Sequence, residues 1–467
     1  MGFDIRGFEL EELTGVEYRS RVEITGRVSR SLVEEISRSK KEPEWMRRLR
    51  LRALEYFEEA PAPQWLPYIQ RIDLDEITTL YTKPDVEVAS DWSDLPEEVR
   101  RIYERLGLPE AYARYLAGLT TVLDSESVFV GVKDFLRRLG VVMVPMEEAV
   151  QKYPDLVKKY FSRVFPYTDH KFAALHYALW SGGVFVYVPR GVRVPYPVEA
   201  FFFLGREMEG QFEHSLIVAD EGSELVFIEG CSAPRLRRES FHDGMVEIYA
   251  HPSSRVSFVT VQNWSRNVIN FNNKRAVAEE GAFVEWVEGS IGSKITVTYP
   301  STVLRGEGAK TVSTLLSISN GGYIKDTGSK VIHAAPRTSS RVLSKSIVAN
   351  GGLSVYRGLT QVNKGAVGSF SHVECESLIL DEKSGSYTYP IVHLLERDAD
   401  VGHEASTLRL SEDQVFYLMS RGLKRNEAVS LVVNGFVRDV LRKLPFEFAS
   451  MLKRVVELEF EEYGGVG

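Results

Sequence analysis

Cysteine is almost missing from this sequence: its 467 residues include only two, Cys231 and Cys375. The chain has no Cys-x-x-Cys pair, which excludes a zinc ribbon and a thioredoxin-like redox motif. Four cysteine thiolates hold a ferredoxin-type cluster, so this chain cannot build such a site alone. Any cluster here must use other ligands, a second subunit, or both.

An excess of positive charge and a long apolar run are also lacking. Lys and Arg number 57 against 65 Asp and Glu, a net charge of −8, which argues against a nucleic-acid binder. No apolar run reaches about 18 residues, so no transmembrane helix is predicted. The N-terminus lacks an apolar signal core, and Arg6 stands where N-myristoylation needs Ser or Thr. These features predict a cytoplasmic protein with neither nucleic acid nor membrane as partner.

The common catalytic motifs are absent as well. The sequence contains no Walker A motif, no G-x-G-x-x-G after a strand, no HExxH and no serine nucleophile elbow. A carbohydrate-active β-helix enzyme would need clustered acidic residues, and none is evident. These absences leave the chain without a recognisable catalytic motif.

Short strand-like runs fill the chain from Gly182 to about residue 400, for example VFVYVP, ELVFIEG and RVSFVTVQNW. Turn residues separate them at small intervals, a pattern typical of a sandwich, a barrel or a β-helix. Glu-Gly phrases precede two of the strands, at Asp220-Glu221-Gly222 and Glu279-Glu280-Gly281, and favour stacked coils. The pattern leaves all three all-β architectures open.

Helical patterns flank the β region, and the length alone predicts two or three domains. We expect a mostly helical N-terminal region (1–165, with helices near 42–60, 95–120 and 131–160), a β core (166–408) and a C-terminal helical domain (409–467). Ser411 and Gln414 form a capping box, and Gly422 and Pro445 are stop signals. The apolar stripe of this last region either packs on the β core or docks another subunit.

Three residues could bind a metal together. Cys375 lies between Glu374 and Glu376, which would raise the pKa of a free thiol and so argue against a nucleophile. Glu404 follows Cys375 by 29 residues, with His403 directly before it, and the two sites would stack if one coil of a solenoid takes about that length or half of it. Cys, His and carboxylate form a mixed set that iron accepts. The alternative is that Cys375 is a buried structural cysteine.

The second cysteine, Cys231, lies at a strand end or turn, since Gly230 and Pro234 flank it. Gln262, Trp264 and Lys274 form a polar and aromatic set further along the chain. These three residues could belong to a functional site. Alternatively, Trp264 packs in the core and the polar residues lie on the surface. Spacing alone does not bring Cys231 near Cys375.

An ordered set of phrases resembles one known family over nearly the whole chain. The phrases are KKEPEWMRRLRLRALEYF (40–57), HKFAALHYALWSGGVFVYVPRGV (170–192), IVADEGSELVFIEGCSAP (217–234), VQNWSRNVINFNNKRA (261–276), KDTGSKVIHAAPRTSSRVLSKSI (325–347), GLSVYRGL (352–359), VECESLIL (373–380), TYP (388–390), HEAST (403–407) and EDQVFYLMSRGL (412–423). The family is that of the SufB scaffold subunits of SUF iron–sulfur cluster assembly, within the wider SufB/SufD family.

The resemblance implies a right-handed parallel β-helix core flanked by helical N- and C-terminal regions. It implies that Cys375 accepts sulfur and ligates a transient [2Fe-2S] or [4Fe-4S] cluster, with His403 and Glu404 as further ligands. Cys231 would accept persulfide sulfur from a desulfurase system. A tunnel would join the two cysteines, lined in part by Gln262, Trp264 and Lys274.

The resemblance also implies partners. They are a SufC-like ABC ATPase docked on the C-terminal helices, a SufD-like subunit or a second copy of the chain, a sulfur donor and apo-protein acceptors. ATP hydrolysis would belong to the ATPase. One departure stands out: many relatives carry Arg-x-Asn where this chain reads Phe203-Leu204-Gly205. The alternative function is that of a SufD-like structural partner without its own cluster.

Overall fold

The computed structural model describes residues 19–68, 72–74, 77–85, 88–90, 116–234, 236–444, 449 and 453. It is mainly β, with 47% strand and 21% helix. Most of the helix predicted near 95–120 and the stop signal at Pro445 lie outside the described residues. In the described part, no helix is both long and apolar enough to cross a membrane.

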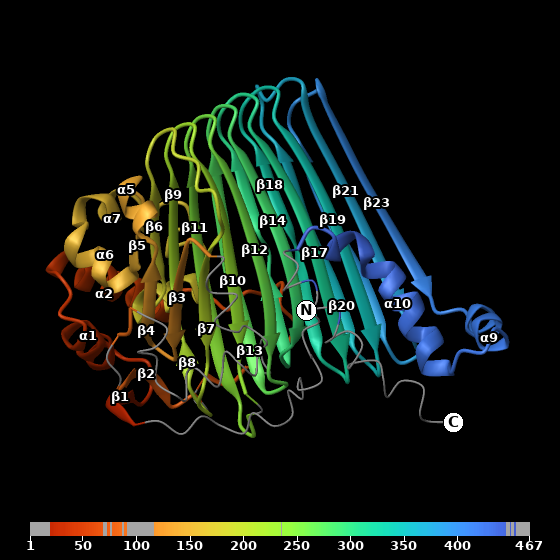
Figure 1. Cartoon of the computed structure of the whole chain (residues 1–467), viewed down its shortest axis with the longest axis horizontal. Helices are drawn as coiled ribbons and strands as arrows, with labels where there is room; N and C mark the ends of the chain where they lie inside the picture. The colour runs from red at the N-terminus through yellow and green to blue at the C-terminus, as the bar shows by residue number, and fades with distance from the viewer. Residues whose placement is uncertain are drawn as a thin grey trace.

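Two large sheets form the body of the molecule (Figure 1). The first has the order β23 (Ala399–Arg409), β21 (Ser369–Ile379), β19 (Ser339–Ala349), β17 (Lys310–Asn320), β14 (Phe283–Gly292), β12 (Arg255–Trp264), β10 (Glu224–Ser232), β7 (Val198–Phe203), β3 (Gly118–Leu123) and β4 (Glu126–Val132). The second has the order β22 (Gly385–Leu394), β20 (Leu353–Val362), β18 (Ile324–His333), β15 (Ile295–Thr298), β13 (Val268–Ala278), β11 (Ser240–Ala250), β9 (His214–Ala219), β6 (Val184–Val188) and β5 (Val142–Pro145).

Four further strands of the described residues lie off these two strand orders. Strand β16 (Ser301–Leu304) pairs with β13 and β18, and β8 (Gly210–Gln211) pairs with β11. Strands β1 (Ser20–Thr25) and β2 (Thr79–Pro84) form a separate antiparallel pair.

From β9 onward the chain alternates between the two sheets, with β15 and β16 together on the second sheet, and strands of neighbouring coils pair in parallel. This arrangement is a parallel β-solenoid of about eight turns, which confirms the β-helix among the three architectures that the strand pattern allowed. One coil takes about 30 residues: Cys375 pairs in register with Ala405. Gly222 and Gly281 adopt positive φ at the corners before β10 and β14, where the Glu-Gly phrases predicted turns.

Helices lie at both ends of the solenoid (Figure 1). They are α1 (Arg30–Ser39), α2 (Glu44–Glu59), α5 (Asp134–Arg138), α6 (Met146–Lys152), α7 (Pro154–Tyr160), α8 (Lys171–Leu179), α9 (Glu412–Ser420) and α10 (Arg425–Leu441). Helix α2 begins after Pro43, as its sequence predicted. The N-terminal region also contains strands: β3, β4 and β5 extend the two sheets, because their apolar runs bury both faces.

Three apolar clusters surround and fill the sheets. The lumen between the sheets contains Phe227, Phe258, Trp286 and both cysteines. Helices α1, α2 and α8 cover the outer face of the second sheet. Val429, Val433 and Val437 of α10 pack on the outer face of the first sheet, and Lys345 of β19 donates to the carbonyl of Phe436.

The last coil is open. Strands β22 and β23 are the terminal strands of their sheets, and most of their residues are exposed. Tyr387, Tyr389, Ile391, Leu394 and Leu408 are large apolar side chains with about half of their surface exposed. Long, exposed, apolar edge strands present unpaired backbone groups to any passing strand and are normally covered.

Two glycines with the same backbone conformation test how tightly the coils stack. Gly292 has φ +67° and a Cβ there would lie 1.8 Å from the carbonyl oxygen of Trp264; Gly308 has φ +68° and a Cβ there would meet nothing within 4 Å. We expect Gly308→Ala to lower the free energy of unfolding by about 1 kcal/mol through backbone strain alone. Gly292→Ala should cost about 3 kcal/mol more, because the coil must shift.

Denaturant unfolding followed by circular dichroism measures both variants against the parent chain. Equal losses for the two alanines would contradict the close backbone contact between β12 and β14.

Candidate functional site

The open coil brings Cys375 and His403 together. The Cys375 Sγ lies 3.5 Å from the His403 Nε2, although the two residues are 28 positions apart in the chain. Both side chains point into the lumen, because Cys375 is buried in β21 and His403 pairs with the buried Val373. A sulfur and an imidazole nitrogen at this distance can share one metal ion after a small movement.

Burial controls the protonation of this pair. It raises the pKa of Cys375 to about 12, which the Tyr356 hydroxyl opposes and Glu374 reinforces. Burial together with His372 holds the pKa of His403 below its ordinary value. The sequence predicts a raised thiol pKa from the flanking glutamates, but removal of Cys375 from water contributes more to that rise. The resting pair is therefore a neutral thiol beside a neutral imidazole, and a bound metal would release the thiol proton.

Glu404 lies on the other face of the strand. Strand β23 pairs with β21 in unbroken register, and Glu404 pairs with the outward-facing Glu374. Side chains alternate faces along a strand, so Cys375 and Glu404 lie on opposite sides of the sheet. The backbone of β23 keeps its register through Gly402, and this chain alone does not bring Glu404 to Cys375.

Cys231 is buried in the lumen near the other end of the solenoid, on β10. Burial raises the pKa of its thiol well above the ordinary value, and the nearby Glu229 and Glu213 raise it further, whereas Lys274 lowers it. Both cysteines are free thiols.

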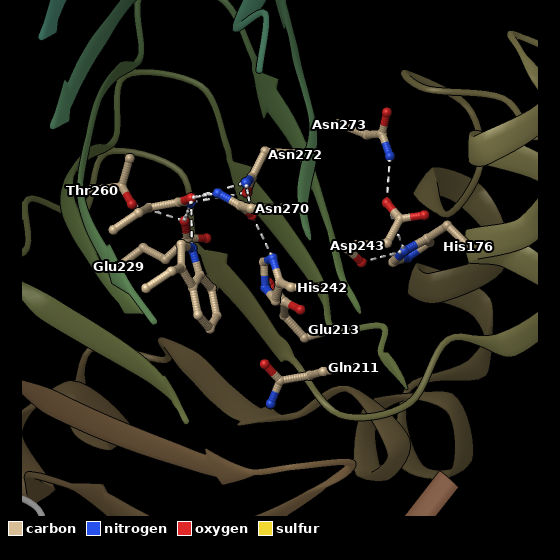
Figure 2. Close-up of polar contacts among 12 residues, drawn as sticks. His176, Gln211, Glu213, Glu229, His242, Asp243, Thr260, Asn270, Asn272 and Asn273 are labelled. Atoms are coloured by element: carbon tan, nitrogen blue, oxygen red, sulfur yellow. Dashed lines mark hydrogen bonds and ion pairs between the residues drawn. The ribbon is translucent and has the colours of Figure 1, made fainter. Parts of the chain in front are cut away.

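Gln262, Trp264 and Lys274 form part of one buried polar network beside Cys231 (Figure 2 shows its neighbours). Gln262 pairs in register with Cys231 and accepts a hydrogen bond from the Trp264 Nε1 at 3.2 Å. The Lys274 ammonium lies 3.4 Å from both Glu229 and Glu288. Burial opposes its charge, yet these two carboxylates hold the pKa of Lys274 above its ordinary value.

Two columns of inward-facing residues run between the cysteines along the first sheet. In register with Cys231 stand Gln262, Ser290, Ser317, Ser346 and Ser377. In register with Cys375 stand Ser344, Leu315, Glu288, Thr260 and Glu229. All but Leu315 are polar, which is unusual for the interior of a fold.

A small void lies about midway along these columns. Its volume is about 10 Å³, room for roughly one water molecule, and Glu288, Ser290, Ser317, Thr298 and Thr327 contribute to its wall. The lumen is therefore polar and incompletely filled at a point between the two cysteines.

The Phe203-Leu204-Gly205 segment does not place an aromatic ring of Phe203 at Cys231. Phe203 packs in the outer apolar cluster, and Phe202 is the residue in register with Cys231. The amide of Gly205 donates to Asp124 at 2.6 Å. The inward neighbours of Cys231 on this strand are thus apolar.

Sequence reasoning missed several polar residues of the lumen, among them Glu213, His242, Asn270, Asn272 and Tyr356. One signal was present: Asn270 and Asn272 alternate with Ile269 and Phe271 in NVINFNNKRA, which marks a polar face of a strand. The spacing of Glu213 and His242 gave no comparable signal.

The apolar stripe of the C-terminal helices divides in two. Val415, Ala428 and Val433 are buried against the first sheet, whereas Phe416 and Leu431 are 72% and 54% exposed. The buried residues confirm the packing interpretation for their part of the stripe, whereas docking of another subunit on the exposed residues stays a prediction.

Comparison with known proteins gives consistent matches over most of the chain. A family model described as "SUF system FeS cluster assembly, SufBD core domain" matches residues 202–436, and one for the "SufBD protein N-terminal region" matches residues 132–200. The chain is 41% identical over 440 residues to the iron-sulfur cluster assembly protein SufB of Bacillus subtilis, with 94% of each chain covered. Iron-sulfur cluster assembly SufBD family proteins of Staphylococcus aureus and Staphylococcus haemolyticus match with the same identity and coverage.

The raised thiol pKa values predict slow alkylation. Thiolate is the nucleophile, so at pH 8 both cysteines of the native protein should react with iodoacetamide at least about a hundredfold more slowly than in denaturant. Cys375 should also make the fold less stable as pH rises from the ordinary thiol pKa toward 12, since the folded state favours the protonated form. Mass spectrometry of tryptic peptides over time measures the rates. Rapid labelling of native Cys375 at pH 8 would contradict its buried, neutral state.

Proposed function

Because the chain belongs to the SufBD family of SUF iron–sulfur cluster assembly proteins, we propose that it is the scaffold on which the cluster is built. It would accept iron and sulfur, assemble a labile [2Fe-2S] or [4Fe-4S] cluster and pass it to apo-proteins. The chain itself is not an enzyme in this proposal, and ATP hydrolysis belongs to a partner. Its free thiols suit a reducing compartment such as the cytoplasm.

The contact between Cys375 and His403 carries the proposal. It joins a soft thiolate ligand and an imidazole, 3.5 Å apart, on the last two strands of an open sheet edge. One thiolate and one imidazole are fewer ligands than a stable cluster needs. A site completed by a second chain would hold its cargo less firmly than four cysteines, as release to an acceptor requires.

The second chain would pair along β22 and β23. These edge strands expose Tyr387, Ile391 and Leu408, which a partner of the same architecture would cover. The partner is a SufD-like subunit or a second copy of this chain. Glu404, on the outer face of β23, is a proposed ligand that would reach the cluster only if the edge strand turns on pairing.

Sulfur would arrive at Cys231. Its thiolate would attack the sulfane sulfur of a donor persulfide, forming a persulfide on Cys231 and releasing the donor thiol. Lys274 favours the thiolate, since it lowers the pKa of Cys231. The polar columns and the void between the cysteines support a route through the lumen to Cys375, with Gln262 and Trp264 at its start.

A SufD-like structural role without a cluster is the second candidate. Its supporting observation is that, among the residues that the structure describes, the contact at the edge joins two ligand atoms, those of Cys375 and His403. Reconstitution separates the two roles.

Anaerobic reconstitution with iron and sulfide should give the protein a cluster with visible absorption, and Cys375→Ala should lower the cluster yield at least about tenfold. Cys231→Ala should reduce sulfur loading from a persulfide donor and leave chemical reconstitution largely intact. Ser377→Ala is the matched control, a buried β21 residue on the same face of the strand as Cys375.

If Cys375→Ala gave the same absorption spectrum and cluster yield as the parent chain, Cys375 would not be a cluster ligand. If the parent chain gained no cluster even with a partner subunit present, the SufD-like role would replace the scaffold. Equal loss in both assays for Cys231→Ala would make Cys231 a ligand of the cluster itself rather than a sulfur relay.

The exposed residues of α9 and α10 generate a test of the ATPase partner. Phe416→Asp should abolish binding of a SufC-like ABC ATPase while circular dichroism stays unchanged, because Phe416 is 72% exposed. Val433→Asp should instead disrupt the packing of α10, because Val433 is fully buried and an unpaired buried charge is costly. Calorimetry measures binding. Full ATPase affinity in a folded Phe416→Asp variant would place the docking site elsewhere.

A further inference from the structure

Three ligand atoms of different chemistry converge in the lumen near the N-terminal end of the solenoid. A carboxylate oxygen of Glu213, the sulfur of Cys231 and a ring nitrogen of His242 all lie within 4.8 Å of one another, and all three residues are buried. They come from three places in the chain: the turn before β9, strand β10 and strand β11. Thiolate, imidazole and carboxylate are together the ligands of borderline divalent metals such as Fe²⁺, Co²⁺ and Zn²⁺.

A chain of hydrogen bonds fixes which nitrogen of His242 carries the proton. The Trp264 indole can only donate, so the Gln262 atom that faces it, 3.2 Å away, is the oxygen Oε1. The Asn270 Nδ2 donates to the same oxygen at 2.6 Å, which leaves the Asn270 Oδ1 to accept from the His242 Nδ1 at 2.8 Å. Figure 2 shows His242 between Asn270 and Glu213. The proton of a neutral His242 therefore sits on Nδ1, and Nε2 is the free ligand atom.

The free nitrogen faces a carboxylate. The His242 Nε2 lies 2.7 Å from the Glu213 Oε1, so a proton or a cation must lie between them. The other carboxylate oxygen, Glu213 Oε2, is buried and has no hydrogen-bond partner among the described residues. A buried carboxylate oxygen without a partner lowers the stability of the fold, and such unsatisfied oxygens mark sites where an ion or a water molecule binds.

The charge balance of the set suits a divalent cation. Lys274 pairs with Glu229 and Glu288, and Glu213 takes no part in those two ion pairs. A thiolate on Cys231 and a carboxylate on Glu213 carry two negative charges, and a neutral His242 adds none. A divalent ion makes the whole group neutral, which is the form that a low-dielectric interior accepts at least cost.

We propose that Glu213, Cys231 and His242 bind one divalent transition-metal ion of the Fe²⁺, Co²⁺ and Zn²⁺ class, with the proton of Cys231 leaving as the metal enters. Trp264, Gln262 and Asn270 are positioning residues, since they hold the His242 tautomer without touching the metal. This second site is separate from Cys375 and His403, and it rests on side-chain geometry rather than on the scaffold function. It would let the protein hold iron beside the thiol that accepts sulfur.

Cobalt tests the site because thiolate-to-Co²⁺ charge transfer absorbs in the near ultraviolet. The full-length Cys375→Ser variant removes the only other thiol, so any such band must come from Cys231. Titrated with Co²⁺ without oxygen, this variant should show the band and bind one equivalent. In the same background, Glu213→Gln and His242→Gln should weaken Co²⁺ binding at least about tenfold, and Trp264→Phe about tenfold through the tautomer.

Trp286→Phe in that background is the matched control for Trp264→Phe. It removes another buried indole N–H of the lumen, one that donates to Thr302 outside the three-ligand set, and it should leave the cobalt band and affinity unchanged. Thermal melts verify folding of every variant. A Cys375→Ser protein that shows no thiolate band with 1 mM Co²⁺ overturns the proposal, and so does an affinity that folded Glu213→Gln and His242→Gln leave intact. Cluster reconstitution on the parent chain is independent of each of these results, so failure of the metal site and of the scaffold function are distinguishable.

Discussion

The in-register pairing of one coil on the next decides where every inward side chain of this protein lies. Cys231 stands beside Gln262, and Cys375 beside Ser344, because the strands pair residue for residue over about ten positions. A slip of one residue would turn each of these side chains to the opposite face. The close approach of Gly292 to the Trp264 carbonyl shows how little freedom the stacking leaves. The polar columns, the Cys375–His403 contact and the Glu213–Cys231–His242 set all depend on this register.

The buried lumen imposes the second constraint, which is electrostatic. Polar and charged groups inside it must find partners, and most do: Lys274 pairs with two glutamates, and Trp264 begins a network through Gln262 and Asn270. Thiols adapt differently, because burial keeps both cysteines protonated until a cation or a sulfur donor arrives. The same low dielectric that keeps the thiols protonated also strengthens the attraction between a bound metal cation and a thiolate, so a bound metal readily deprotonates them. The two thiols of this lumen are therefore expected to react only once a metal cation or a sulfur donor is present.

The two ends of the solenoid differ in how far other elements cover their strands. Helices α1, α2 and α8 pack on the sheet at the N-terminal end, where Cys231 lies. At the other end β22 and β23 remain exposed, and Cys375 sits one strand from that edge. A closed end suits capture of small cargo, and an open edge suits a site completed by another chain. This asymmetry supports the different steps proposed above for the two thiols.

The sequence by itself determined the β-rich body, the flanking helices and the family, since strand runs, helix caps and ordered phrases are local signals. The resemblance to the family also singled out Cys375 and His403, whereas the coil of about 30 residues that stacks them is visible only in the register of β21 and β23. Only the tertiary structure decided that Glu404 faces away from Cys375 and that Phe203 turns away from the lumen, since facing depends on strand alternation within a fixed register. Only the fold could bring Glu213 and His242 to Cys231, because three separate segments meet there and no local pattern links them.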